Sequence, residues 1–182
     1  MPISINGSGT VTGISVGGLP DGIVDTDMIA ATAVTAAKRG PGTILQVVNA
    51  KTSTAVAYST DTFADNGMTA NITPLFASSK ILIQANVNGA HVTTANLNQM
   101  QLRLLRDSTV IGTFGTEVGH SNGALAQNGV GTGGATSYLD SPNTTSQITY
   151  KVQQRKRLTP TMTVTSQYAS AESYITLYEV SA

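Results

Sequence analysis

The sequence contains no cysteine and no tryptophan, and only 11% of its residues are charged. Without cysteine, the chain has neither a disulfide framework nor a thiolate metal site. Average domains carry about 25% charged residues, and here the basic and acidic residues also balance to a formal net charge of zero. Proteins that neutralise phosphates need an excess of basic residues, so we expect no nucleic acid among the partners.

Long apolar runs are also missing. No segment approaches the roughly 20 apolar residues that cross a bilayer, which predicts no membrane insertion. The first seven residues lack the basic and apolar regions of a signal peptide, so we expect release from a cell only by lysis. Thr, Ser, Asn, Gln, Gly and Ala replace the missing charge, as in many extracellular assemblies; an ordinary neutral globular domain is the alternative.

The residue types that carry catalysis are few. Histidine is the commonest general base, and the chain has only His91 and His120. Glu117 and His120 have the spacing of a metal pair, but this spacing converges only on a helix, which Gly119 disfavours. Residues 129–134 match the pattern GxGxxG without the preceding strand and following helix of a dinucleotide site. We expect no catalytic residue, no cofactor and no metal, and hence no enzyme.

Acidic residues are spread singly along the chain. Antiparallel strands could nevertheless bring Asp140 and Glu172 together as a carboxylate pair for glycoside hydrolysis. A small depolymerase or lyase is therefore the competing class of function, and a bacterial lectin-like module is a third.

The N-terminal part of the chain differs from the rest. Residues 1–20 hold short β-like patches separated by glycines, which either add strands to a partner or form an unstructured tail. Over residues 21–40, the helical spacing of Ile29 and Ala33 predicts a short helix, with Gly40 beyond its last turn. Its mostly alanine face could pack closely around a threefold axis, so Ile29 and Ala33 are candidate subunit-interface residues.

From about Thr43 onward, apolar and polar residues alternate in the pattern of half-buried antiparallel strands. The clearest examples are residues 81–88, 100–105, 148–153, 162–164 and 174–178. Asn-Gly pairs, which readily form tight turns, occur at residues 66–67, 88–89, 122–123 and 128–129. Many short strands without intervening helices predict an all-β, antiparallel jelly-roll sandwich. We expect residues 112–136, rich in glycine, to form long loops at one end of it.

Two strand segments carry candidate binding residues. On the last strand, Tyr174 and Tyr178 alternate with Ile175 and Leu177. If the aliphatic pair enters the core, the tyrosines lie outside, where they indicate a subunit interface or a glycan platform. The basic residues at alternate positions of residues 151–157 share one strand face. This face would either bind an anion such as a polysaccharide or be the solvated side of an edge strand.

The expected loop region holds three amide side chains, Asn122, Gln127 and Asn128. Amides both donate to and accept from sugar hydroxyls, so these residues are candidate contacts to a host surface glycan. The alternative is that this loop only caps the sandwich or packs on a neighbouring subunit.

Several segments, taken in order, resemble the C-terminal knob domains of tail-fibre and virion-appendage proteins of tailed phages, especially marine and cyanobacterial phages. They are residues 42–48 (GTILQVV), 69–74 (TANITP), 78–83 (SSKILI), 138–142 (YLDSP), 148–152 (ITYKV) and 175–180 (ITLYEV). Residues 22–38 resemble the short stalk or attachment segments of such proteins.

The resemblance implies a jelly roll similar to those of tumour necrosis factor and the complement globular heads, assembled as a homotrimer without catalytic residues. Residues 1–40 would then attach the chain to other virion proteins and form the trimer stalk, and residues 41–182 would form the knob. The implied function is a tail-fibre or receptor-binding subunit of the virion, made in the host bacterial cytoplasm. Because the segment before the knob is short, a head decoration protein on the capsid is the alternative.

Overall fold

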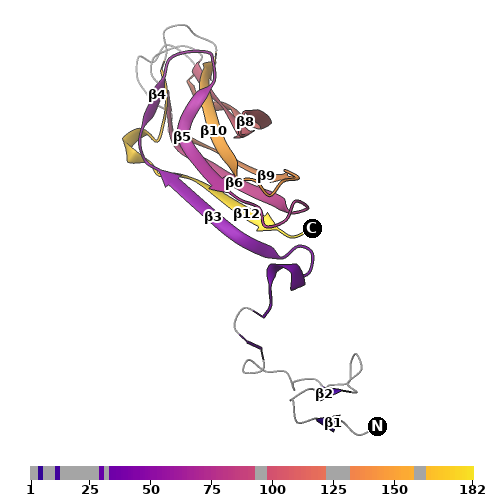
Figure 1. The fold of residues 1–182 in the computed structure, drawn as a ribbon. Helices are drawn as coiled ribbons and strands as arrows, with labels where there is room; N and C mark the ends of the chain where they lie inside the picture. Colours follow the sequence, from indigo (N-terminus) through magenta and orange to yellow (C-terminus); the bar gives the residue numbers. More distant parts are fainter. Residues whose placement is uncertain are drawn as a thin grey trace. The chain divides into compact units, whose positions relative to one another are not determined.

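The computed structural model describes residues 4–5, 11–12, 29–30, 33–92, 98–121, 132–157 and 163–182. The chain forms two compact units, Met1–Arg39 and Gly40–Ala182. In the first unit, β1 (Ser4–Ile5) pairs with β2 (Val11–Thr12) as an antiparallel ribbon, and η1 (Ala36–Lys38) is one turn of 3₁₀ helix (Figure 1). The attachment, stalk and knob roles expected of the two parts stay predictions.

The helix predicted over residues 21–40 is wrong where the structure describes it. Residues 33–40 contain only the turn η1, and residues 21–28 and 31–32 lie outside the described ranges. None of the η1 residues is buried, and Thr35 at its start makes no capping hydrogen bond. Helices this short depend on packing of an apolar face, and none of the described alanines of this segment is buried.

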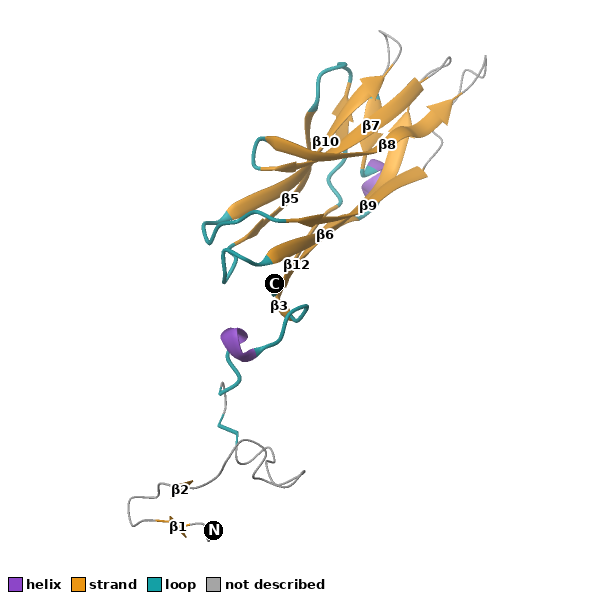
Figure 2. Cartoon of the chain, turned by 90° about the vertical axis from the view of Figure 1, so that its right-hand side faces the viewer, coloured by secondary structure: helices purple, strands orange, loops and turns teal. Residues whose placement is uncertain are grey.

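The second unit is an all-β sandwich of two antiparallel sheets (Figure 2). Its eight long strands are β3 (Ile44–Thr52), β5 (Ala64–Ile72), β6 (Lys80–Val92), β7 (Asn98–Arg106), β8 (Thr109–Ser121), β9 (Thr132–Asp140), β10 (Ile148–Arg157) and β12 (Ser173–Val180). Of the two short strands, β11 (Val164–Ser166) pairs with the last residues of β6, and β4 (Val56–Tyr58) pairs with β11. The turn η2 (Tyr168–Ser170) leads from β11 to β12.

The strand order is that of a jelly roll. One sheet has the order β3-β12-β6-β9 and the other has the order β5-β10-β7-β8, with every pairing antiparallel. Numbered along the chain, the eight long strands therefore stand first, eighth, third and sixth in one sheet, and second, seventh, fourth and fifth in the other. This arrangement of two interlocked Greek keys confirms the predicted fold class.

The hydrophobic core lies between the two sheets. Along β6, Ile81, Ile83 and Val87 have no exposed surface, whereas Leu82 between them is half-buried. The facing sheet contributes Leu102 and Tyr150, which are also fully buried. The period-two pattern of the sequence thus separates core from surface as predicted, since alternate side chains of a strand point to opposite faces.

The two Asn-Gly pairs inside described strands are bulges rather than the predicted turns. Gly67 in β5 has φ 85° and Gly89 in β6 has φ 61°, and the strand register shifts at each point. A Cβ on Gly89 would lie 2.7 Å from the backbone nitrogen of Tyr168, so this position also needs the small residue for close approach of η2. Positive φ serves a bulge as well as a turn. Residues 122–123 and 128–129 lie outside the described residues.

The long loop expected over residues 112–136 is also partly wrong. Strands β8 and β9 occupy both of its ends, and residues 122–131 lie outside the described residues. A Cβ on Gly134 would lie 2.6 Å from Cδ1 of the buried Leu102. Glycine is thus used here for close packing of β9 over the core rather than for turning the chain.

Candidate functional site

The outer face of the sheet β3-β12-β6-β9 carries one row of apolar side chains. Cross-strand pairing brings Val47, Tyr178, Leu82 and Leu139 into line across four neighbouring strands. Val47 is 54% exposed and Leu139 is 51% exposed, while the two central side chains are half-buried. We call these four residues the apolar row. Exposed apolar side chains that form a continuous strip are typical of a surface that contacts another molecule.

Toward the start of β12, the next two rows of this face are mostly polar. In the next row, Asn49 donates to the hydroxyl of Thr176 over 2.8 Å. One row further, Asn86 donates to the hydroxyl of Tyr174 over 3.2 Å, beside an open pocket of about 420 Å³. Gln84 and Ser137 also line this pocket. The apolar row is therefore bordered on one side by rows that are hydrogen-bonded or open to water. On its other side, the pair of Val180 and the exposed Ile44 continues the apolar surface.

The structure confirms the orientation predicted for the last strand. Ile175 and Leu177 are 1% and 0% exposed in the core, whereas Tyr174 is 40% exposed and Tyr178 is half-buried on the outer face. Tyr178 belongs to the apolar row, and Tyr174 lies at the pocket. Their role in a subunit interface stays a prediction.

The other predicted contact residues are less well placed. Ile29 is 44% exposed and Ala33 is exposed, but the helix that would align them is not formed over the described part of residues 21–40. The three amides of the expected receptor-contact loop, Asn122, Gln127 and Asn128, lie outside the described residues.

The outer face of the other sheet carries alternating guanidinium and amide groups on β7 and β10. Arg103 pairs across the strands with Gln153, and Arg155 pairs with Gln101. Nε and Nη2 of Arg103 donate to Oε1 of Gln153 over 2.8 and 2.6 Å, and Nε of Arg155 donates to Oε1 of Gln101 over 2.7 Å. We call these four residues the arginine–glutamine ladder. Each guanidinium is thus oriented by a neutral amide.

An aromatic ring holds the two arginines of the ladder together. Phe63, which precedes β5, has the guanidinium carbon of Arg103 4.0 Å from its ring centroid and that of Arg155 4.5 Å away. The electron-rich faces of aromatic rings attract cations at such distances. This contact offsets part of the repulsion between two neighbouring positive charges.

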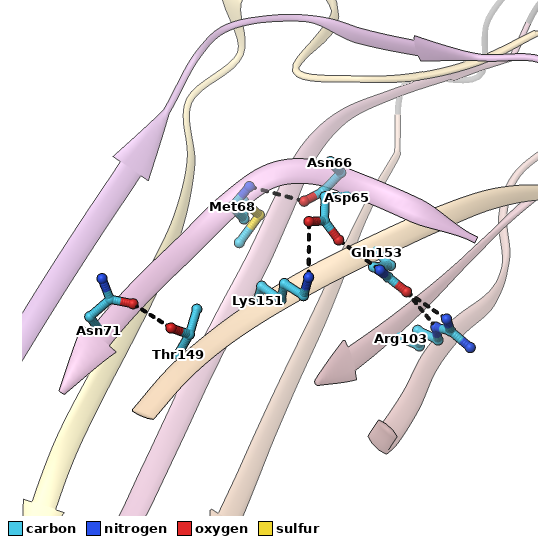
Figure 3. A network of polar contacts seen from close by, with 8 residues as sticks. All are labelled: Asp65, Asn66, Met68, Asn71, Arg103, Thr149, Lys151 and Gln153. Atoms are coloured by element: carbon cyan, nitrogen blue, oxygen red, sulfur yellow. Dashed lines mark hydrogen bonds and ion pairs between the residues drawn. The ribbon is translucent and has the colours of Figure 1, made fainter. Parts of the chain in front are cut away.

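One carboxylate borders the ladder. Asp65 of β5 accepts hydrogen bonds from Lys151 over 3.0 Å and from Gln153 over 2.7 Å (Figure 3). Partial burial alone would raise the pKa of Asp65, but the hydrogen bonds from Gln153 and Lys151 and the nearby positive charges lower it overall. Gln153 therefore lies between Asp65, to which it donates, and Arg103, from which it accepts.

The edge-strand interpretation of residues 151–157 is wrong. Strand β10 pairs with β5 on one side and with β7 on the other, so it is interior to its sheet. Its basic residues therefore do not protect a free edge.

Sequence reasoning also missed Arg103, because its partner Gln153 lies 50 residues further along the chain. Glutamine and arginine occur at every second position of residues 99–103 and 153–157, and this pattern indicates that the two strands present similar polar faces.

The two carboxylates considered for glycoside hydrolysis, Asp140 and Glu172, have separate partners. Asp140 binds Arg106 and Tyr150, whereas Glu172 forms an ion pair with Lys51 over 2.9 Å. The ring of His91 stacks on that of Tyr168 with centroids 3.9 Å apart.

The described parts of the sequence patterns that suggested metal or dinucleotide sites lie on strands. Glu117 and His120 both lie in β8, and the glycines at the end of residues 129–134 lie in β9 rather than before a helix. Among the described residues, no three His, Asp or Glu side chains group as metal ligands. None of the helical segments in the described ranges has the length and apolar character of a bilayer-spanning helix.

No protein-family model and no curated protein matches the chain. Among solved structures it is similar to a chain in the structure of the infectious bursal disease virus Gt strain, with 11% identity and a TM-score of 0.39. It is also similar to a chain of the Gx strain, with 12% identity and a TM-score of 0.36. These matches cover 75% and 76% of this chain but only 38% of each viral chain. Similarity this distant assigns no function.

Proposed function

We propose that the chain is a non-enzymatic structural subunit of a tailed-phage particle, in which the jelly roll forms one third of a homotrimeric knob on a tail fibre. The observation that carries the proposal is the apolar row on the outer face of the sheet β3-β12-β6-β9. The resemblance of the sequence segments to phage knob domains supports the same assembly. Host attachment through the knob is the function that follows.

The apolar row fits a contact between copies of the chain. Val47 and Leu139 stand at opposite ends of the row and are both more than half exposed, so covering them would remove apolar surface from water. Tyr178, between them, combines an apolar ring with a polar hydroxyl, as residues of subunit interfaces commonly do. A closed threefold ring would cover this surface in each copy without leaving a free one for filament growth.

Light scattering of the full chain tests the assembly. We expect a mass three times that of the 18.7 kDa chain at micromolar concentration. Substituting Val47→Glu would place a charge in the apolar row and should shift the protein to monomers. Val110→Glu is the matched control, because Val110 is 44% exposed on β8 of the other sheet. A wild-type monomer, or equal dissociation of both variants, would contradict the interface.

Immunogold labelling of purified phage particles tests the location. Label at the fibre tips supports the knob. Label spread over the capsid would replace it with the head decoration alternative, and absence from particles would reject the virion role.

A further inference from the structure

The arginine–glutamine ladder is a preorganised cationic surface. Two guanidinium groups on adjacent strands are each anchored through Nε to an amide oxygen and are held against one ring, that of Phe63. Long side chains normally lose rotamer freedom when they bind a partner. Here the free protein already orients them, which lowers the entropic cost of binding.

In the part of the chain that the structure describes, no ion pair neutralises the positive charge of the ladder. Within the described residues, neither Arg103 nor Arg155 forms an ion pair with a carboxylate, and the acid of this face, Asp65, pairs with Lys151. The other hydrogen bond of Arg155 goes to the backbone oxygen of Asp61 over 3.4 Å. The Nη atoms of the two guanidiniums therefore keep N–H groups for an incoming anion, since a guanidinium has five.

The pattern of the ladder favours one class of anion. Guanidinium groups bind carboxylate and sulfate oxygens through paired hydrogen bonds. The amides of the ladder are already engaged within the protein, because their oxygens accept from the two arginines and the amide nitrogen of Gln153 donates to Asp65. A ligand that matches the two guanidiniums carries acidic groups at intervals along an extended chain. An acidic polysaccharide has this chemistry.

Nucleic acid fits the same face less well. Duplex binding depends on a broad positive field, but the chain has a net charge of zero. Single strands bind by stacking bases on open aromatic rings, and Phe63 is already in contact with both guanidiniums. The local charge suits a few acidic groups rather than a continuous phosphate backbone.

We propose that the arginine–glutamine ladder on β7 and β10 binds an acidic polysaccharide. Arg103 and Arg155 contact its carboxylate or sulfate groups, and Gln101 and Gln153 hold the two guanidinium groups in position. This binding needs only one copy of the chain. As a receptor contact it deepens the proposed function and rests on it, but the binding itself does not depend on the apolar row.

Titration calorimetry of the full chain with polysaccharides tests the proposal. The probes are dextran sulfate, polygalacturonate, neutral dextran and a DNA duplex. We expect both acidic polymers to bind, neutral dextran not to bind, and the affinity for dextran sulfate to fall as salt rises. The double variant Arg103→Gln, Arg155→Gln should bind dextran sulfate about 10-fold more weakly or worse, because it removes two charge-assisted contacts.

The matched control is the double variant Lys51→Gln, Lys80→Gln. It removes the same amount of charge from exposed positions on the other sheet, and should bind within about twofold of wild type if the contact is local. Equal losses in both double variants would show that only net charge matters and would overturn the proposal. No binding of either acidic polymer by wild type, or tighter binding of duplex DNA, would overturn it as well.

A measurement on the wild-type protein decides the case if the arginine variant fails to fold. Phenylglyoxal modifies accessible arginines, and mass spectrometry locates the modified residues. Dextran sulfate should protect Arg103 and Arg155 but leave the modification of the exposed Arg39 unchanged. Unaltered modification of both ladder arginines would reject the site. The monomeric Val47→Glu variant should be protected equally, which separates this result from failure of the trimer.

Discussion

The hydroxyl of Tyr150 donates a 2.7 Å hydrogen bond to Oδ2 of Asp140, and this contact joins the two sheets of the sandwich. Tyr150 is the third residue of β10, an interior strand of its sheet, and is fully buried, whereas Asp140 is the last residue of β9 in the opposite sheet. Arg106, at the end of β7, donates to both oxygens of the same carboxylate over 3.0 and 2.9 Å. The buried carboxylate is thus satisfied by one hydroxyl and one guanidinium from the facing sheet.

Removing either end of this contact should destabilise the fold. Tyr150→Phe removes the hydroxyl that donates to Oδ2 of Asp140, and we expect a decrease of about 1–2 kcal/mol in the free energy of unfolding. Asp140→Ala leaves both Tyr150 and Arg106 without their acceptor, with an expected decrease of about 3–5 kcal/mol. Urea denaturation measures both. Tyr138→Phe, at an exposed position of β9, is the control and should change the value by less than about 0.5 kcal/mol.

The same contact predicts a loss of stability at alkaline pH. Burial, then the hydrogen bond to Asp140 and its negative charge, raise the pKa of Tyr150 well above its ordinary value. The unfolded tyrosine ionises near about pH 10, while the folded one keeps its proton, so the unfolded state binds fewer protons above that pH. This contribution to stability is complete below about pH 10 and decreases above it, by up to about 1.4 kcal/mol per pH unit.

Urea denaturation at a neutral and at a strongly alkaline pH checks this prediction. The wild-type protein should lose more unfolding free energy between the two than Tyr150→Phe, which has no phenol to ionise at this position. Equal losses in the two proteins would show that the alkaline dependence comes from other groups.

The bulge at Gly89 should not tolerate a side chain. Gly89→Ala would place a Cβ 2.7 Å from the backbone nitrogen and 2.8 Å from the backbone oxygen of Tyr168, at a φ of 61°. We expect a loss of about 2 kcal/mol or more, because both the backbone angle and the space oppose the substitution. Gly112→Ala is the matched control: nothing lies within 4 Å of its Cβ position, and its stability should stay near wild type. Thermal unfolding of the two variants compares them directly.

The sequence was sufficient for the sandwich but not for its irregular points. Alternation such as that of Ile148, Thr149 and Tyr150 depends only on local pattern, and it identified the core face correctly. The Asn-Gly pair at residues 88–89 forms a bulge, and η2, about 80 residues later, packs closely against it. Local sequence specifies positive φ but not which neighbour requires it.

The candidate site was only half visible for the same reason. The tyrosines of β12 could be placed outward from alternation alone, but the apolar row needs the pairing of Tyr178 with Val47 and Leu82. Likewise, Arg155 stood out as part of a basic cluster, whereas its amide partner Gln101 belongs to another strand. Binding faces of a sheet are built across strands, so their residues are joined only by register.

Glu179 provides a last test of how the sandwich is closed. Its carboxylate is fully buried at the end of β12, where Oε1 accepts from the backbone nitrogens of Leu75 and Phe76 over 2.7 and 3.4 Å. Oε2 accepts from Nε2 of Gln46 on β3. The side chain thus fixes the connection between β5 and β6 to the sheet β3-β12-β6-β9, and backbone donors replace the water that the carboxylate loses on burial.

Glu179→Ala should therefore cost about 2–4 kcal/mol, because the buried donors of the connection lose their shared acceptor. Glu179→Gln should lose less unfolding free energy than Glu179→Ala, because glutamine keeps the shape and one acceptor oxygen. It should still be less stable than wild type, because its amide nitrogen would face one of the N–H donors that the carboxylate accepts from. Glu172→Ala is the matched control: its side chain is 54% exposed in an ion pair with Lys51, so its loss should stay within about 1 kcal/mol. Hydrogen exchange should rise at Leu75 and Phe76 in Glu179→Ala and not in Glu172→Ala. Unchanged protection of these amides would show that the connection is held by its backbone alone.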